Sequence, residues 1–251
     1  MRREYSTTLT AVVNEKGVVD VDVVKGCTDG MKAYPGGGCY GSCYALKSAR
    51  MRGLVFEKSI VRQVTRRSQL NEIVRAAKKS KLPFIRIGTM GDPSFDWGVT
   101  MSHAKLFAES GLWVVIITKH WRRISEERLL DLGPRIIFNT SVSALDTRGE
   151  RDHRVTEFER IKPYARSILR VVTCNFNREN EKGREFAAIQ DRLLARGSTI
   201  DTPLRVPASY PLVKAGIISV RKVGRQMVSL HDEKVYLGKC GDCPDLCGVG
   251  L

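Results

Sequence analysis

The sequence predicts an α/β fold with parallel strands, in the form of a full or partial (β/α) barrel. Short apolar segments alternate with stretches of helical periodicity, and this alternation produces right-handed βαβ units and a parallel sheet. Small polar residues follow most of the apolar segments, as they do where a barrel carries its functional groups. The 251 residues are 42% hydrophobic and 27% charged, a globular composition that supports one substantial core.

The first strand is expected over residues 18–24, where Val and Asp alternate or run together just before Gly26 and Cys27. A Gly-rich loop over residues 34–41 then leads into Cys43. From there to Lys81, apolar residues recur at helical spacing with basic residues between them. We therefore expect this stretch to be helical.

The remaining elements follow Pro83 in regular alternation. Strands are expected at residues 84–87, 112–117, 136–138 and 168–172, with last strands supplied by 204–206 and 217–220. Helices are expected at residues 101–109, 124–132, 155–164 and 181–196. These elements predict an α/β domain over residues 1–225 and a Cys-rich, metal-tied C-terminal segment over 226–251.

The charge of the chain indicates a polyanionic partner. It has 42 Lys and Arg against 27 Asp and Glu, a net charge of +15 and a pI near 9.7. Residues 47–81 hold eleven of these cations against two Glu, and a second cluster at residues 119–123 surrounds Trp121, an aromatic that can stack on a base. A solvated helix face is the alternative explanation. We expect a nucleic acid partner, DNA rather than RNA.

No membrane partner is expected. The longest apolar run, residues 112–117, has six residues, whereas a membrane-spanning helix needs about 20. The N-terminus lacks the apolar core of a secretory signal, so we expect a cytoplasmic protein.

Six of the seven Cys residues fall in two clusters, which in a reducing compartment indicates metal ligation rather than disulfides. The first set is Cys27, Cys39 and Cys43, separated by eleven and three residues. Three thiolates suit an iron–sulfur cluster with one iron left open. A zinc loop with a distant fourth ligand is the alternative, although zinc ligands are usually two to four residues apart.

Polar residues gather where the expected strands end. They form four short segments at residues 88–93, 118–120, 139–143 and 173–177. At one mouth of a barrel, their hydroxyl, amide and charged groups, Thr118 among them, suit a polar nucleoside-like cofactor. Taken singly, each is better explained as a turn residue that satisfies backbone groups, and it is their recurrence at four strand ends that indicates a site. Lys119 and His120 are candidate catalytic residues here, His120 as an acid or base.

Together, four motifs resemble the radical S-adenosylmethionine superfamily: the three-Cys loop running into Cys43-Tyr44-Ala45, Met90-Gly91-Asp92-Pro93, Ile117-Thr118-Lys119 and the segment at 139–143. More narrowly, they resemble phage-encoded radical-SAM-like proteins distantly related to spore photoproduct lyase. The resemblance covers roughly residues 18–180. It implies a [4Fe-4S] cluster on Cys27, Cys39 and Cys43 that binds S-adenosylmethionine, an external one-electron reductant and a 5′-deoxyadenosyl radical. It also places the protein in a host cytoplasm.

The same resemblance assigns the cofactor contacts. Gly91 and Asp92 match the segment that meets the amino group of the cofactor, and Ser141 and Ser143 match contacts to its ribose or carboxylate. Two features depart from the family. The Cys spacing is eleven and three instead of three and two, and Ser42 replaces the usual aromatic before the third Cys, so Tyr44 or Tyr40 would have to cover the adenine.

The second set is Cys240, Cys243 and Cys247, among glycines that let the backbone wrap an inorganic core. It suits either a second iron–sulfur cluster or zinc, with His231 or Cys174 as the fourth ligand. The two Cys sets could also exchange roles. Cys174 is a candidate radical-quenching thiol, or a small buried apolar residue.

The resulting hypothesis is a radical S-adenosylmethionine enzyme that modifies or isomerises a base in nucleic acid, phage DNA in particular. Radical chemistry serves where the hydrogen to be removed is too weakly acidic for a general base. Two alternatives stay open. One is a non-catalytic, zinc-containing nucleic-acid-binding protein, and the other is a radical enzyme acting on a peptide or small metabolite.

Overall fold

The structure is a computed structural model of the 251-residue chain. It describes residues 4–6, 10–13, 17–27, 39–40, 43–53, 61–63, 67–80, 82, 84–130, 132–224, 226–232, 243 and 245–250.

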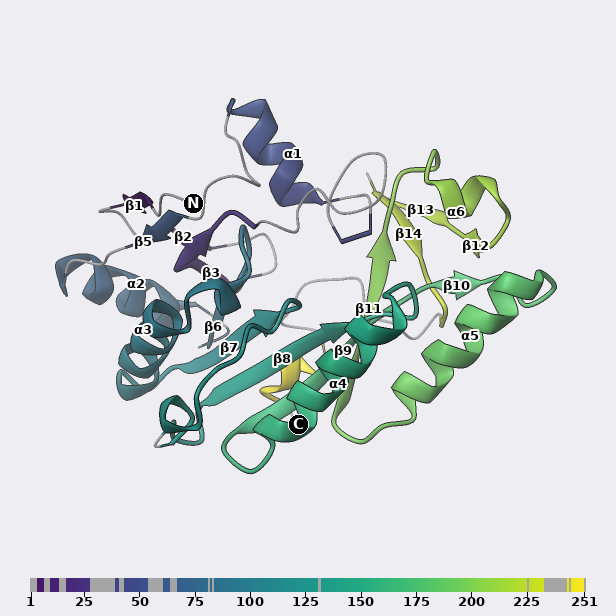
Figure 1. The fold of residues 1–251 in the computed structure, drawn as a ribbon. Helices are drawn as coiled ribbons and strands as arrows, with labels where there is room; N and C mark the ends of the chain where they lie inside the picture. Colours follow the sequence, from purple (N-terminus) through teal and green to yellow (C-terminus); the bar gives the residue numbers. More distant parts are fainter. Residues whose placement is uncertain are drawn as a thin grey trace.

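A nine-stranded, mostly parallel sheet forms the centre of the molecule (Figure 1), in the order β13-β14-β11-β9-β8-β7-β6-β3-β2. Its six parallel strands are β3 (Val19–Asp22), β6 (Phe84–Ile87), β7 (Trp113–Thr118), β8 (Ile136–Val142), β9 (Arg166–Thr173) and β11 (Thr199–Arg205). Antiparallel strands flank them: β2 (Thr10–Val13), β14 (Gln226–Ser229) and β13 (Arg221–Val223). The α/β class with a parallel sheet is therefore confirmed.

The sheet is open. Strands β2 and β13 are its two edges, and no pairing between described strands joins them. A closed barrel is therefore not formed by the strands that the structure describes. Smaller pairings lie outside this sheet: β1 (Glu4–Ser6), β5 (Val61–Gln63) and β4 (Val24–Lys25) form one, and β10 (Asn175–Phe176) with β12 (Ile218–Ser219) forms another.

The main helices begin at side chains that satisfy their free N–H groups. Thr147 and Glu150 form a capping box at the start of α4 (Arg148–Ile161). Asp96 caps α3 (Trp97–Glu109), and Asn180 caps α5 (Glu181–Leu194). The other helices are α1 (Tyr44–Met51), α2 (Arg67–Lys79) and the short α6 (Pro211–Lys214).

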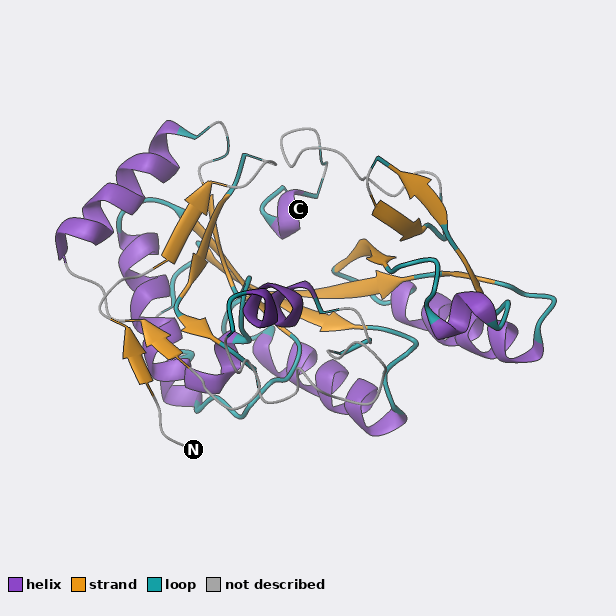
Figure 2. Ribbon diagram, turned by 90° about the horizontal axis from the view of Figure 1, so that it is seen from above, coloured by secondary structure: helices purple, strands orange, loops and turns teal. Residues whose placement is uncertain are grey.

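The two faces of the sheet are covered by different parts of the chain. On β7, Val114 and Ile116 belong to the core that includes residues of α3, whereas Val115 belongs to a second core on the alternate side. Leu246 and Val249 of the C-terminal segment pack against that second core. Figure 2 shows the C-terminal 3-10 turn, η4 (Leu246–Gly248), on the side of the sheet opposite α4 and α5.

Three expected elements differ from the structure. The described residues between 124 and 132 contain a 3-10 turn, η2 (Glu126–Arg128), in place of the expected helix. Ile124 and Leu129 are buried from an irregular loop and do not lie on a helical face. The described residues of the basic stretch from Tyr44 to Lys79 include two helices with β5 between them. Residues 217–220 do not extend the main sheet, since β12 pairs with β10. The predicted boundary at 225/226 falls inside the β13–β14 hairpin.

Among the helices that the structure describes, none combines the length and the apolar character needed to cross a bilayer.

The contact between the C-terminal turn and the sheet can be tested at Gly248. Its φ is +93°, and an added Cβ would lie 2.8 Å from Cγ1 of Ile168. Gly216, at φ +66°, has no atom within 4 Å of the same position. Both substitutions to Ala strain the backbone, but only Gly248→Ala also overpacks the core. We expect Gly248→Ala to lower the free energy of unfolding by about 1–3 kcal/mol more than Gly216→Ala, measured by urea denaturation. Equal losses would contradict this packing.

Candidate functional site

Asp92 ties together the ends of two neighbouring parallel strands, β6 and β7. Its Oδ1 accepts hydrogen bonds from the Thr118 hydroxyl at 2.6 Å and the Ser94 N–H at 2.9 Å. Its Oδ2 accepts from the backbone N–H groups of Lys119 at 2.7 Å and His120 at 3.0 Å. These four bonds match the roughly four acceptor positions of a carboxylate. Asp92 therefore positions the loop after β7, with its oxygens occupied by the protein.

Competing effects set the charge of Asp92. Burial raises the pKa of the carboxyl, but the charge of His120 and the hydrogen bond from Thr118 oppose burial and leave the pKa below its ordinary value. The side chain is an ionised carboxylate at neutral pH.

Gly91 lies against the backbone that precedes the first Cys. It forms a parallel bridge with Gly26, and an added Cβ would lie 2.4 Å from the Val24 carbonyl oxygen. Only glycine permits this approach. The end of β6 is thereby held beside the start of the Cys-containing loop, directly before Cys27.

Cys39 reaches the end of β7. Its Sγ lies 3.4 Å from Nε2 of His120. Burial raises the pKa of the Cys39 thiol to about 11, although the charges of Lys119 and Arg154 act in the opposite direction.

The other two thiols of the first set occupy the helix start and the core. Cys43 is the N-cap of α1, and its Sγ accepts a hydrogen bond from the N–H of Leu46 at 3.5 Å. Cys27 is buried in the core that also contains Leu46, and Cys43 packs against that same core. Within the part of the chain that the structure describes, no group of three or more Cys, His, Asp or Glu is arranged to hold a metal ion.

A buried ion network extends the site from β7 to α4. Asp146 contacts Nζ of Lys119 at 2.9 Å through Oδ1 and forms an ion pair with Arg154 through Oδ2. Arg154 also donates from Nε to the Lys119 carbonyl at 2.7 Å, and Nζ of Lys119 donates to the Tyr40 hydroxyl. The network holds Lys119 in place.

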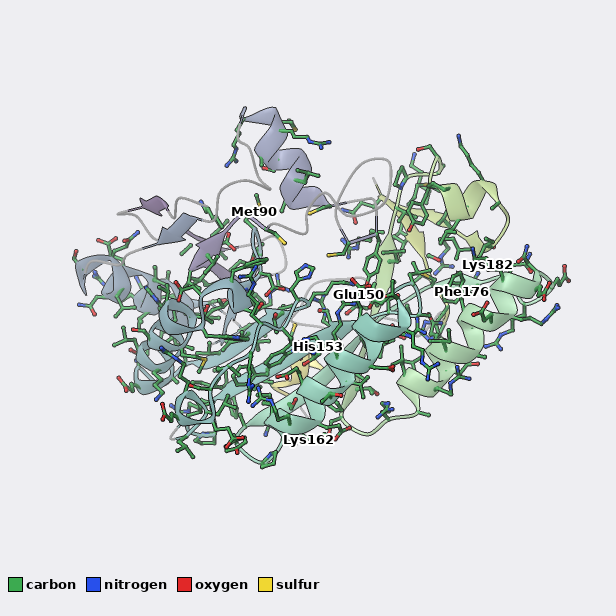
Figure 3. The ribbon with its side chains drawn as sticks, in the orientation of Figure 1. Met90, Glu150, His153, Lys162, Phe176 and Lys182 are labelled. Atoms are coloured by element: carbon green, nitrogen blue, oxygen red, sulfur yellow. The ribbon has the colours of Figure 1, made fainter. Side chains whose placement is uncertain are left out.

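Helix α4 also contacts the loop after β7 through His153. Figure 3 shows α4 with Glu150 and His153 labelled. Nε2 of His153 lies 2.9 Å from the Trp121 carbonyl oxygen.

The pKa values in this network follow from burial and pairing. Burial lowers the pKa of Lys119, while Asp146 acts to raise it. Burial raises the pKa of Asp146, but Lys119 and Arg154 outweigh it and leave the pKa below its ordinary value. Asp146, Arg154 and the contact of Tyr40 with Lys119 were not among the predicted site residues. Asp146 follows β8 by four residues, so its position after a strand was the available signal.

The hydroxyl residues differ in their availability to a ligand. Thr118 donates to Asp92, and Ser143 donates to the Val172 carbonyl at 2.8 Å. Both hydroxyls are therefore used inside the protein. The Ser141 hydroxyl has no hydrogen-bond partner among the described residues, and Ser141 is nearly buried. Ser141 is the member of the predicted set whose polar group is available. The side chain of Tyr44 lies outside the described residues.

Two predicted roles need revision. Trp121 cannot stack on a base from its present position: it is 1% exposed, its Nε1 donates to Thr140, and its ring packs 5.3 Å from that of Trp97. Lys119 is likewise buried in the ion network, so it does not belong to an exposed basic cluster.

Cys174 is fully buried. Its backbone N–H and carbonyl are both bound by the side-chain amide of Gln190, and burial raises the pKa of its thiol. This burial favours the interpretation of Cys174 as a small apolar residue.

The second Cys set is described only in part. Cys240 lies outside the described residues, and Cys243 and Cys247 are partly buried. Cys247 packs beneath the sheet, and its carbonyl accepts from Nδ2 of Asn139 at 2.9 Å. Nε2 of His231 lies 3.0 Å from Oδ2 of Asp201.

Comparisons with protein-family models, with curated proteins and with solved structures gave no match for this chain.

The role of Asp92 is tested by Asp92→Asn. The amide has one acceptor oxygen in place of two, so it cannot accept all four hydrogen bonds, and at pH 7 we expect a loss of about 2–4 kcal/mol in the free energy of unfolding. A carboxyl whose folded pKa lies below 3.8 stabilises the fold above that pH, and this contribution disappears as the pH falls through the folded value. The difference from wild type should therefore shrink toward pH 3 in urea denaturation. Exposed Asp152→Asn is the control, with little change expected at any pH. A pH-independent loss in Asp92→Asn would contradict the ionised carboxylate.

Proposed function

We propose that this protein is a radical S-adenosylmethionine iron–sulfur enzyme that modifies or isomerises a base in nucleic acid, with phage DNA as the substrate class. One observation carries the proposal. Residues of the three-Cys loop contact the ends of β6 and β7, the two strands whose ends hold motifs that match the family. The Gly26–Gly91 bridge joins one side of the loop to β6, and the approach of Cys39 to His120 joins the other side to β7. The sheet would then be the wall of a partial barrel.

The donor chemistry fits an iron–sulfur cluster in part. Cys39 lies four residues before Cys43, the N-cap of α1. Burial raises the pKa of the Cys39 thiol to about 11, while the cations of Lys119 and Arg154 act in the opposite direction and would support a thiolate ligand. Cys27 would have to join them, since the described residues do not bring three ligands to one point. When bound, the cluster and S-adenosylmethionine would supply hydrogen-atom abstraction, with electrons from an external reductant.

The chain itself would orient the cofactor and exclude water. Ser141 would offer a free hydroxyl to the cofactor. Gly91, in close backbone contact with Val24 and Gly26, would hold the Cys loop beside the end of β6. Lys119, held by Asp146, would place a cation where a carboxylate can be bound. The C-terminal Cys set would carry a second iron–sulfur cluster or zinc.

The nucleic acid part of the proposal depends on exposed cations. Arg75, Lys78 and Lys79 are exposed on α2, while Ile73 and Ala77 of the same helix are buried. Arg122 and Arg123 are exposed directly after the site at the end of β7. With the net charge of +15, these groups suit a phosphate backbone.

One distance favours a second candidate, a zinc-containing nucleic-acid-binding protein without catalysis. A tetrahedral zinc with bonds of about 2.3 Å to sulfur and 2.0–2.1 Å to nitrogen separates these ligands by about 3.6 Å. The Cys39 to His120 distance of 3.4 Å is close to that value. The metal content of the purified protein distinguishes the two candidates.

The enzymatic proposal is tested by anaerobic purification, reconstitution with iron and sulfide, and measurement of 5′-deoxyadenosine. We expect reductant-dependent product from the wild type, and loss of both product and iron absorption at the first cluster in Cys39→Ala. Cys174→Ala, which removes a buried thiol from a different core, should keep its iron. Zinc without iron, and no 5′-deoxyadenosine from the wild type, would overturn the proposal in favour of the zinc protein.

Phosphate contacts by α2 are tested by Arg75→Gln, Lys78→Gln and Lys79→Gln combined. Each lost phosphate contact reduces the slope of log affinity against log salt by about 0.9, so we expect a slope smaller by up to about 2.7 in fluorescence anisotropy with duplex DNA. The matched control replaces Arg128, Arg135 and Lys162, three exposed cations away from α2; Arg135 directly precedes β8, and Lys162 directly follows α4. Equal slopes for the two triple variants would remove α2 from the interface.

A further inference from the structure

A pocket of about 350 Å³ lies beyond the end of β9, apart from the Cys-containing loop. Its walls come from two antiparallel pairs, β10 with β12 and β13 with β14. Asn175 and Ser219 line it from the first pair, and Arg221 and Val228 line it from the second. Val220, the residue between β12 and β13, joins the two pairs. The volume is at the lower end of the roughly 300–1,000 Å³ found for small-ligand sites.

Two polar side chains of this pocket, those of Asn175 and Ser219, are available to a ligand. Asn175 and Ser219 face each other across the β10–β12 pair, so their side chains share one face of it. Both are exposed, and neither the side-chain amide of Asn175 nor the Ser219 hydroxyl has a hydrogen-bond partner among the described residues. These two groups together offer both donors and acceptors.

His231 adds an oriented ring to the pocket wall. Its Nε2 is held at 3.0 Å from Oδ2 of Asp201, while its Nδ1 is buried with no hydrogen-bond partner in the described part of the chain. A buried ring nitrogen without a partner is costly and is relieved when a ligand supplies one. Fixing of one nitrogen by a carboxylate sets the orientation of the other.

We infer that this pocket binds a single nucleobase extruded from the nucleic acid. The proposal rests on the nucleic acid substrate of the proposed function and names the place that receives the target base. Val220 and Val228 supply apolar surface for the faces of a planar ring, and Asn175 and Ser219 supply hydrogen bonds to its edge. Arg221, exposed at the same pocket, places a cation for the phosphate beside the base.

The position of the pocket supports the same occupant. Asn175 directly follows Cys174, whose buried core also includes Phe176 and has Tyr40 packed against it. Figure 3 shows Phe176 and Lys182 at this end of the molecule, beside the start of α5. Since Tyr40 also contacts Lys119, one side chain connects the pocket's core with the Cys39 site. A base held in the pocket would therefore lie on the same side of the sheet ends as the proposed cofactor.

The experiment uses duplex DNA with one 2-aminopurine, whose fluorescence rises when the base leaves the stack. With the full-length protein, we expect a rise of severalfold at saturation. Ser219→Leu fills the pocket and Asn175→Ala removes its amide, so each should lose more than half of the rise while DNA affinity by anisotropy changes less than twofold. Ser102→Leu, at an exposed position on α3, is the matched control and should keep the full rise.

No rise with the wild type, or a full rise in both pocket variants, would overturn the base site. If millimolar free deoxynucleosides suppress the rise, the pocket recognises the base itself. If they do not, binding of the base requires the attached DNA strand. Both outcomes support a base site. The fluorescence requires neither cluster nor S-adenosylmethionine nor turnover. Failure of the base site is therefore distinguishable from failure of 5′-deoxyadenosine formation.

Discussion

The arrangement of the site depends on one buried carboxylate. Asp92 receives two hydrogen bonds at each oxygen, from its own turn and from three consecutive residues at the end of β7. A buried charge is tolerated only when its acceptor positions are filled, and here the filling groups are those that fix the loop after β7. The directions in which His120 and Lys119 leave the sheet are consequences of this constraint. The contacts of His120 with Cys39 and of Lys119 with Asp146 follow from it.

Close backbone contact holds the turn after β6 against β3 and the chain that leads to Cys27. Gly91 lets the β6 turn approach Val24 and Gly26, and Asp22 accepts from the N–H groups of Thr89 and Met90 at 2.9 and 2.7 Å. Burial raises the pKa of Asp22, opposed by those two hydrogen bonds. Strand β3 and the chain leading to Cys27 are thereby fixed to β6 by polar contacts. One face of the sheet is covered by apolar contacts instead: the C-terminal turn packs on apolar side chains of β7, β8 and β9.

The sequence predicted the parallel strands well because each is a short apolar run bounded by Gly, Pro or polar residues, as at Phe84–Ile87 and Trp113–Thr118. It failed at residues 124–132, where apolar spacing resembles a helix but Ile124 and Leu129 anchor a loop. The strand-end rule found Asp92, Thr118 and Lys119. It could not find Arg154, which lies inside α4 and joins the site only through tertiary contact, nor could it show that Trp121 turns into the core.

The charge balance of the buried network bears on what the site can hold. Lys119 and Arg154 carry two positive charges, and these face two carboxylates: Asp146, which contacts both cations, and Glu150, 3.8 Å from Arg154. The network beside Cys39 is therefore balanced within the protein. Burial raises the pKa of the Cys39 thiol to about 11, against the opposing charges of Lys119 and Arg154. Because these two cations are already paired with carboxylates, formation of the thiolate at Cys39 needs a further positive charge, which a bound metal ion would supply.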